Sequence, residues 1–273
     1  MPSYFITGAA RGIGYEFIRQ YSADPSNLVI GTVRNKAATE KKASEDPELK
    51  DRSNIHILEA DVTKYSDLER AAADAAKVTG GKLDYVIANA GIVPMFDAYD
   101  PIGDLGDRPE EVAKTLRDTF EIHVVANVHL FTLLMPLILK GNAKKVVAIT
   151  SGFSDVDFTN KWDMTPGPLY SISKAALNMV IAKFSAQYKR QGVLFLAVCP
   201  GMVEVGHYNK STEQDNAKLR ETVAKFMQYA PEFRGPIKPE ESVTCMRKVI
   251  TEASIEKGNG GDYLSHFGTK QWL

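Results

Sequence analysis

The chain has 273 residues, of which 44 % are apolar, 33 are basic and 34 are acidic, so its net charge is −1. A chain of this length buries roughly 75 % of the surface that it exposes when unfolded, so a stable core needs neither disulfides nor a structural metal. The neutral balance, without long runs of Lys or Arg, argues against a nucleic-acid or membrane partner bound through a basic face.

The sequence carries no pattern typical of secretion or of a membrane span. The N-terminus runs directly into the apolar residues 4–6 without a signal-peptide pattern, which predicts a cytoplasmic protein. The longest apolar stretch, 130–139, is shorter than the ~20 residues that a membrane span needs. Cys199 and Cys245 have no neighbouring cluster of ligand-type side chains, so we expect two buried thiols and no metal site.

Apolar, β-rich runs alternate with segments of helical periodicity along the whole chain. Strands are predicted at residues 4–6, 28–33, 55–60, 83–88, 145–150, 193–199 and 262–264. Helices are predicted at residues 12–22, 36–46, 66–78, 110–139, 170–190, 212–229 and 239–255. This order is typical of a doubly wound α/β domain, in which helices cover both faces of a central parallel sheet of about seven strands. No linker interrupts it, so we expect a single domain over 1–273.

Two connections are longer than the about 2–6 residues that are usual between the strands and helices of such folds. They cover residues 152–169 and 202–236, and the second includes a predicted helix. Both follow the carboxyl ends of strands, where open α/β sheets bind their ligands. We expect a substrate-site loop at 152–169 and a lid that excludes water at 202–236.

A glycine-rich turn, TGAARGIG at 7–14, joins the first strand to the first helix. Gly8 permits a tight turn, Gly12 lets the backbone approach a pyrophosphate, and Gly14 lets the helix pack on the sheet. The N-terminus of the helix attracts the anion. A purely structural turn has a similar composition, but the position between the first strand and the first helix favours a dinucleotide site.

The second strand is followed by Arg34, at the point where a dinucleotide-binding fold selects its cofactor. An acidic residue there would accept hydrogen bonds from the ribose hydroxyls, but residues 28–36 contain no acid. Arg34 and Arg11 instead offer guanidinium groups to a 2′-phosphate. We therefore expect NADP(H), the alternative being that Arg34 is an ordinary solvated residue.

The third and fourth strands end in polar turns on the same side of the sheet as the glycine-rich turn. Asp61 is placed to accept a hydrogen bond from an adenine amino group, with Val62 packing nearby. Asn89-Ala90-Gly91 forms a compact turn that can lie under a ribose. Each motif also has a plain interpretation as strand-end turn chemistry.

The run YSISK at 170–174 places Tyr170 and Lys174 four residues apart on one face of a helix. A phenol has a pKa of about 10, and a neighbouring ammonium group lowers it, which makes a tyrosine a usable proton donor. Ser151 follows the fifth strand, where its hydroxyl could polarise a substrate carbonyl. A Tyr and a Lys four residues apart on a helix often occur by chance, and a serine after a strand often only forms a turn. The combination of Ser151 with Tyr170 and Lys174 favours catalysis.

Together these motifs resemble the short-chain dehydrogenase/reductase family. TGAARGIG, Asp61-Val62, the NAG turn at 89–91, Ser151, Tyr170-x-x-x-Lys174 and Pro200-Gly201 stand in the family's order and span essentially the whole chain. The insert before Tyr170 and the run SISKAALNM resemble carbonyl reductases of the sniffer and cell-signalling-factor type. The C-terminal GGDYLSHFGTKQWL is similar to fungal ketoreductases from secondary metabolism.

The resemblance implies an NADP-binding Rossmann domain and reversible hydride transfer between C4 of a nicotinamide and a carbonyl or alcohol carbon. Tyr170 would act as the acid–base group, Ser151 would orient the substrate oxygen, and Lys174 would bind the nicotinamide ribose and tune Tyr170. The resemblance also implies cofactor contacts from four further residues, Ile13, Pro200, Gly201 and Val203.

Two positions depart from the family's pattern. His123 stands where the family usually has an asparagine that holds a water leading to Lys174. His123 could hold that water or relay protons itself, or it could be structural; Asn127, one turn later, is a candidate for a displaced asparagine. Val205 stands where the family often has a threonine that contacts the nicotinamide carboxamide.

The long connections carry more aromatic and Met side chains than a pocket for a small polar alcohol needs. They are Met95, Phe96, Tyr99, Phe153, Phe158, Trp162, Met164, Tyr208, Phe226 and Phe233, of which the last two could be core. We therefore expect a bulky hydrophobic or aromatic carbonyl, reduced with NADPH. The alternatives are non-redox cyclase or isomerase chemistry on the same fold, or a non-enzymatic NADP(H)-binding regulator.

Helices 110–139 and 170–190 carry apolar residues more widely than one buried stripe requires. Examples are Val124, Val125, Val128, Leu133 and the run 179–182. The resemblance implies a homodimer or homotetramer formed through these helices, and two-sided packing within one domain is the alternative.

Overall fold

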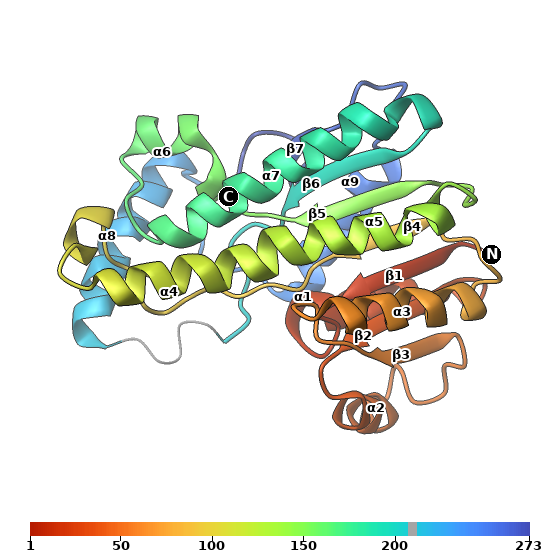
Figure 1. Cartoon of the computed structure of the whole chain (residues 1–273). Coiled ribbons are helices and arrows are strands. Elements are labelled where there is room, and N and C mark those ends of the chain that lie inside the picture. The colour runs from red at the N-terminus through yellow and green to blue at the C-terminus, as the bar shows by residue number, and fades with distance from the viewer. Residues whose placement is uncertain (207–211) are drawn as a thin grey trace.

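The computed structural model describes residues 1–206 and 212–273, and its centre is one parallel sheet (Figure 1). Its strands are β1 (Ser3–Thr7), β2 (Leu28–Val33), β3 (Ile55–Glu59), β4 (Tyr85–Ala88), β5 (Lys145–Ile149), β6 (Leu194–Cys199) and β7 (Tyr263–Ser265). They lie in the order β3-β2-β1-β4-β5-β6-β7, and all neighbouring pairs are parallel. The predicted doubly wound fold is confirmed, and the strand order reverses between β1 and β4, where such sheets bind ligands.

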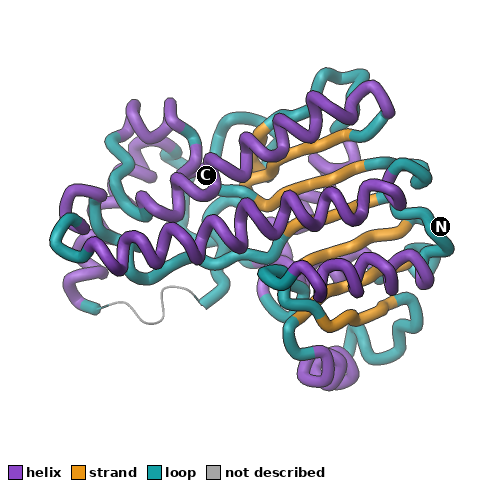
Figure 2. Tube along the Cα trace, viewed as in Figure 1, coloured by secondary structure: helices purple, strands orange, loops and turns teal. Residues whose placement is uncertain are grey.

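Helices cover both faces of the sheet (Figure 2). They are α1 (Gly12–Tyr21), α2 (Lys36–Glu45), α3 (Tyr65–Val78), α4 (Pro109–Phe120), α5 (Ala126–Ile138), α6 (Val156–Trp162), α7 (Pro168–Tyr188), α8 (Glu213–Tyr229) and α9 (Pro239–Glu252). α3, α5 and α7 pack on one face, and α1 and α9 pack on the other. The predicted helices are present, with ends that differ by a few residues.

Successive residues of the central strands point into two separate cores. Phe5 and Phe195 lie under α3, α5 and α7, whereas Ile6 and Leu196 lie under α1 and α9. All four side chains are fully buried. Side chains alternate between the two faces of a strand, and both faces are covered by helices, so the strands read as continuous apolar runs.

The predicted loop 152–169 contains a helix that the sequence pattern did not indicate. A 3-10 turn at Gly152–Ser154 leads into α6, which begins after Asp155. The Asp155 carboxylate caps this helix by accepting hydrogen bonds from the N–H groups of Asp157 and Phe158. At seven residues, α6 is too short to leave a clear helical periodicity.

The predicted helix 110–139 is continuous but contains a π turn at Glu121–Val125 between α4 and α5. By length and composition alone, the helix Pro109–Ile138 could cross a membrane, since its most apolar window has a mean hydropathy of 1.5. This corrects the expectation that no segment is long enough. Half of that window is buried inside the protein, where α5 packs against α3 and α7, as a core helix does.

Only one of the two cysteines is buried. Cys199 ends β6 inside the protein, whereas Cys245 on α9 is partly exposed. The apolar face of α9 carries Val243, Met246 and Ile250 into the core, and Cys245 lies beside that face. The prediction of two buried thiols is therefore wrong for Cys245.

A small third core lies beyond the carboxyl ends of the strands, where α6 and α8 project past the sheet (Figure 2). It contains Phe158 of α6, Phe226 of α8 and the C-terminal Trp272, packed with Met164 and Cys199. This layer forms one side of the site described next.

Candidate active site

Two glycines of the turn between β1 and α1, Gly8 and Gly14, leave no room for a Cβ atom. Gly8 and Gly12 have φ values of 68° and 55°, a region that glycine adopts without strain. A Cβ atom at Gly14 would lie 2.3 Å from the carbonyl oxygen of Gly8 and 2.5 Å from Asn89 Nδ2. Arg11, the N-cap residue of α1, does not cap the helix with its side chain. The first N–H groups of α1 therefore suit an anion.

The turn after β4 is joined directly to the end of β1. Asn89 Nδ2 donates to the carbonyl oxygens of Thr7 and Gly8, at 3.0 and 3.3 Å. The N–H groups of Asn89 and Ala90 both donate to the Thr7 hydroxyl at 3.0 Å. The structure thus brings Asn89-Ala90-Gly91 against the glycine-rich turn at the point where the strand order reverses.

The predicted adenosine-end residues lie at the ends of β2 and β3. Arg11 and Arg34 are both exposed to solvent. Asp61 Oδ1 accepts hydrogen bonds from the N–H and hydroxyl groups of Thr63, at 3.1 and 2.8 Å. Arg34 interacts electrostatically with Asp61, and Val62 packs at the edge of the first core. Asp61 is thus part of a turn, and its contact with adenine stays a prediction.

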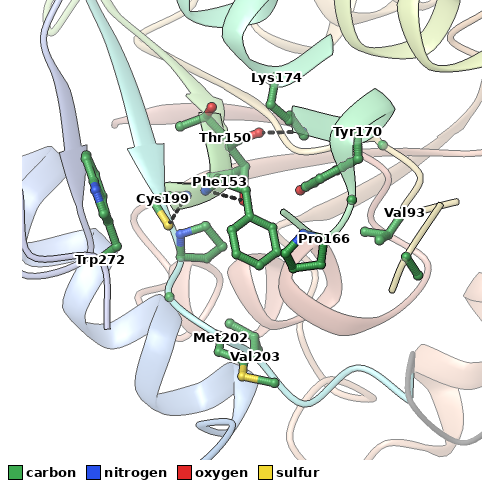
Figure 3. A pocket seen from close by; sticks show the side chains of 18 of the residues that line it. Val93, Thr150, Phe153, Pro166, Tyr170, Lys174, Cys199, Met202, Val203 and Trp272 are labelled. Carbon is green, nitrogen blue, oxygen red and sulfur yellow. Dashed lines mark hydrogen bonds between the residues drawn. The ribbon is translucent and has the colours of Figure 1, made fainter. Parts of the chain in front are cut away.

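Tyr170 and Lys174 lie on the first turns of α7, which begins at Pro168 rather than at Tyr170. Lys174 Nζ lies 5.8 Å from the centre of the Tyr170 ring and donates a hydrogen bond of 2.9 Å to the carbonyl oxygen of Ile149. Lys174 is buried, and this burial lowers the pKa of its ammonium group from 10.5 to about 8. The predicted pair is brought together at one cavity (Figure 3).

Ser151 follows β5 and is fixed by its neighbours. Its hydroxyl accepts a hydrogen bond from the N–H group of Phe153 at 3.3 Å. Its carbonyl oxygen accepts from the Tyr263 hydroxyl and, at 2.6 Å, from the Ser154 hydroxyl. Ser151 lines the same cavity as Tyr170 and Lys174. The hydroxyl therefore forms a turn and is also within the site.

His123 is fully buried, and both ring nitrogens have protein partners. Nε2 accepts from the N–H group of Ile92 at 3.2 Å, and Nδ1 lies 2.9 Å from Ser173 Oγ. Since the Ser173 hydroxyl donates to the carbonyl oxygen of Tyr170, we assign the proton to Nδ1. The ring packs edge-on against Tyr170, with centroids 5.8 Å apart. Burial and the Lys174 ammonium group lower its pKa to about 2, so the ring is neutral.

Asn127 supports the π turn that contains His123. Its Nδ2 atom donates to the carbonyl oxygen of His123 at 2.8 Å. In the π turn the N–H group of Ala126 donates to the carbonyl oxygen of Glu121. The backbone hydrogen bonds around His123 therefore do not follow the regular spacing of an α-helix. With His123 and Asn127 both engaged in internal hydrogen bonds, the geometry favours structural roles for them over a proton relay.

The cavity that contains Ser151, Tyr170 and Lys174 has a volume of about 290 Å³ (Figure 3). It is also lined by predicted cofactor residues, namely Ile13, Asn89, Gly91, Pro200, Gly201 and Val203. Val205 lines it as well, and a Cβ atom at Gly12 would lie 3.2 Å from Val205 Cγ1. Among the described residues, no group of three or more His, Cys, Asp or Glu side chains could hold a metal ion.

The predicted aromatic lining is partly correct. The cavity is lined by Tyr99, Phe153, Phe158 and Phe226. Three others pack in the third core instead, namely Trp162, Met164 and Phe233. Met95 and Phe96 lie outside the cavity lining. Met95 is exposed, and Phe96 packs against the Arg108 guanidinium group, which lies 4.7 Å from the centre of its ring. Tyr208 lies outside the described residues.

The C-terminal residues Trp272 and Leu273 also line the cavity, and sequence reasoning missed them. The Trp272 ring stacks on Tyr263 with centroids 4.3 Å apart, and its Nε1 donates to Asp155 at 2.9 Å. Tyr263 in turn holds the carbonyl oxygen of Ser151. Trp272 therefore supports the segment that carries Ser151, a contact that no local sequence pattern indicates.

Comparisons with known proteins find relatives along the whole chain. The model of the short chain dehydrogenase family matches residues 3–216. The short chain dehydrogenase virK of Hypocrea virens is 52 % identical over 273 residues, and the short-chain dehydrogenase/reductase iacC of Pestalotiopsis fici is 49 % identical over 274 residues; all of this chain and all of each relative are covered.

Solved structures show the same fold. NADPH-bound carbonyl reductase from chicken fatty liver has a TM-score of 0.75 at 24 % identity, and the carbonyl reductase Sniffer of D. melanogaster has a TM-score of 0.76 at 22 % identity. Each match covers 98 % of both chains. The chain is therefore an oxidoreductase of the short-chain dehydrogenase/reductase family, whose members bind nicotinamide cofactors.

Proposed function

We propose that this protein is an NADPH-dependent reductase of a bulky hydrophobic or aromatic carbonyl compound. The observation that carries the proposal is that Ser151, Tyr170 and Lys174 line one largely apolar cavity, which the glycine-rich turn and the turn after β4 also border. Pockets of this kind hold an apolar ligand and orient it with a few polar groups.

The proposed mechanism assigns one task to each of the three residues. The Tyr170 hydroxyl donates a proton to the substrate oxygen, and the Ser151 hydroxyl donates a hydrogen bond that orients that oxygen. The Lys174 ammonium group, anchored on the carbonyl of Ile149, favours the phenolate that remains on Tyr170 and binds the nicotinamide ribose. Bound NADPH supplies the hydride.

The residues at the glycine-rich turn fit this cofactor. Gly14 leaves no space for a Cβ and so lets α1 pack closely on the end of β1, while Gly12, with a φ of 55°, lets the backbone approach a pyrophosphate. α8 contributes Leu219, Thr222 and Phe226 to the cavity wall, and Lys218 on the same helix forms an ion pair with Asp100. We propose that α8 acts as the lid over cofactor and substrate.

The decisive assay monitors NADPH and NADH oxidation by absorbance against a panel of bulky ketones, quinones and aldehydes. Oxidation of NADPH in proportion to alcohol formed supports the proposal. Product formed without NADPH consumption would instead identify a cyclase or isomerase, and binding of NADPH without any turnover would identify a regulator.

Replacing Arg34 by Ala is expected to weaken NADPH binding about 10–100-fold, because a hydrogen bond between charged groups contributes about 1.5–3 kcal/mol. NADH binding should be unchanged, since it has no 2′-phosphate. Fluorescence titration of both cofactors measures this. Arg190→Ala, which removes an exposed guanidinium group elsewhere, is the control; equal NADPH affinity in wild type and Arg34→Ala contradicts the cofactor assignment.

Carbonyl reduction is expected to decline as the pH rises above about 8, because the Lys174 ammonium group, whose pKa burial lowers to about 8, loses its charge there. The pH profile of kcat/KM measures this, and Lys174→Met should lower kcat and remove the decline of activity above pH 8.

The free energy of unfolding should change with pH in the opposite direction. The lysine of the unfolded chain stays protonated up to about its ordinary pKa of 10.5. The cost of the buried charge is therefore fully present below pH 8 and is relieved as the pH rises from there.

We also propose a homodimer or homotetramer. Apolar side chains on the outer surface of α5 and α7 and the turn between α4 and α5 remain exposed in the single chain, with 37 % exposure at Val125 and Val128 and 58 % at Met179. Light scattering measures the assembly state, and a monomer at micromolar concentration contradicts this proposal.

A further inference from the structure

The helix that presents Tyr170 has no N-terminal cap of its own. The N-cap residue of α7 is Gly167, which has a φ of 63° and no side chain. The next residue, Pro168, has no N–H group. The first N–H groups that need an acceptor are therefore those of Leu169 and Tyr170, the positions that an N-cap side chain normally serves.

A residue far away in the sequence supplies this cap. Asp97 Oδ2 accepts the N–H groups of Leu169 and Tyr170, at 2.8 and 3.2 Å. The carbonyl oxygen of Asp97 also accepts the N–H group of Gly167 at 2.9 Å. The carboxyl group is fully buried, and this burial raises its pKa. A buried carboxyl group is costly unless it accepts hydrogen bonds, and here two come from the first turn of the helix that carries Tyr170.

Asp97 joins two parts of the site, the segment that follows the turn after β4 and the first turn of α7. It lies in the segment that continues from Gly91, and Gly91 lines the cavity beside Lys174, where a Cβ atom would lie 3.6 Å from Lys174 Nζ. Ile92, next in that segment, is tied to α7 through His123 and Ser173. The segment is thus joined to the first turns of α7 at two places, and Asp97 makes the joint that includes Tyr170 itself.

We propose that Asp97 is a positioning residue for Tyr170. As a remote cap it fixes the first turn of α7 against the turn after β4, and so holds the phenol at a constant place relative to the nicotinamide end of the cofactor site. This inference rests on the proposed function, in which Tyr170 donates the proton. It requires that loss of the cap lowers kcat more than it affects binding, because misplacement of a reacting group raises the barrier.

The test compares three variants, Asp97→Ala, Asp97→Asn and Asp84→Ala. Asp84 is the matched control, because it is also a buried carboxylate that accepts backbone N–H groups, from Ser3, Asn142 and Ala143, but it lies at the opposite end of the sheet. The readouts are kcat and KM for a carbonyl that the wild type reduces, the melting temperature, and hydrogen exchange of the backbone amides of residues 169–174.

Asp97→Ala is expected to lower kcat about 10–100-fold, with little change in KM and with faster exchange in the first turn of α7. Asp97→Asn should retain most of kcat, because its amide oxygen still accepts both N–H groups. Asp84→Ala should lose thermal stability and keep kcat. The inference is overturned if Asp97→Ala keeps kcat, or if both alanine variants lose kcat in proportion to melting temperature.

The exchange measurement separates this inference from the proposed function. If the wild type reduces no carbonyl, the proposed function fails, and exchange alone reports whether Asp97 holds the first turn. Unchanged exchange at residues 169–174 in Asp97→Ala overturns the inference in that case as well.

Discussion

Replacing Tyr170 by Phe is expected to lower kcat for carbonyl reduction by about 10²–10⁴-fold, the range that a positioned general acid contributes. The change removes one hydroxyl group and leaves the ring, which packs edge-on against His123. The fold and the cofactor site should therefore persist. Quantification of the product at fixed times, together with the rate of NADPH oxidation, measures the loss of kcat. Fluorescence titration is expected to show unchanged NADPH affinity.

Tyr188→Phe is the matched control for this experiment. It removes a phenol hydroxyl from the other end of the same helix, where Tyr188 packs against Phe184 and Phe195. Its kcat should equal that of the wild type. Substantial turnover by Tyr170→Phe, at wild-type NADPH affinity, would contradict the role of Tyr170 and leave another proton donor to be found.

The parts of the fold that rest on local pattern were predictable from the sequence. The central strands are buried on both faces, so they appear as continuous apolar runs, and the alternation with amphipathic helices specifies a parallel sheet. The glycine-rich turn was equally predictable, because its glycines serve the geometry of one short segment. Gly8 has a positive φ, and Gly14 lies too close to the backbone of Gly8 for a Cβ atom. The spacing of Tyr170 and Lys174 reflects one helix face, which the structure confirms.

The parts that rest on long-range contacts were not predictable in this way. Asp97 and Leu169 are 72 residues apart, and no periodicity relates them. Trp272 enters the site through a stacking contact with Tyr263 and a hydrogen bond to Asp155, 117 residues away. Asn178 is a third case: it accepts from Thr150 at 2.7 Å and so ties the end of β5 to α7. In each case the residue acquires its role only through the tertiary fold.

His123 shows why a substitution in a family motif needs a structure to interpret. A histidine has an ordinary pKa near neutrality, so the sequence alone makes a proton relay attractive. Burial and the nearby Lys174 lower its pKa to about 2, and its ring nitrogens join Ile92 to Ser173. These contacts favour a neutral linking group, and the protonation chemistry of the proposed mechanism then falls to Tyr170 and Lys174.

Replacing Gly14 by Ala is expected to weaken cofactor binding strongly. The added Cβ atom would lie 2.3 Å from the carbonyl oxygen of Gly8 and 2.5 Å from Asn89 Nδ2. The first contact is with the backbone, which cannot rotate away, and the second would displace the amide that joins β1 to the turn after β4. Displacing these atoms moves the first N–H groups of α1 away from the pyrophosphate, and a hydrogen bond to a charged group contributes about 1.5–3 kcal/mol, so we expect NADPH affinity to fall about 10–100-fold.

Gly103→Ala separates this effect from a general cost of adding a methyl group. A Cβ atom at Gly103 would have no neighbour within 4 Å, so this variant should bind NADPH as the wild type does and melt at a similar temperature. Overpacking costs about 1–3 kcal/mol, so Gly14→Ala should melt lower and still fold. A folded Gly14→Ala protein with wild-type NADPH affinity would show that the pyrophosphate lies elsewhere, and Gly8, Gly12 and Gly14 would then be a structural turn alone.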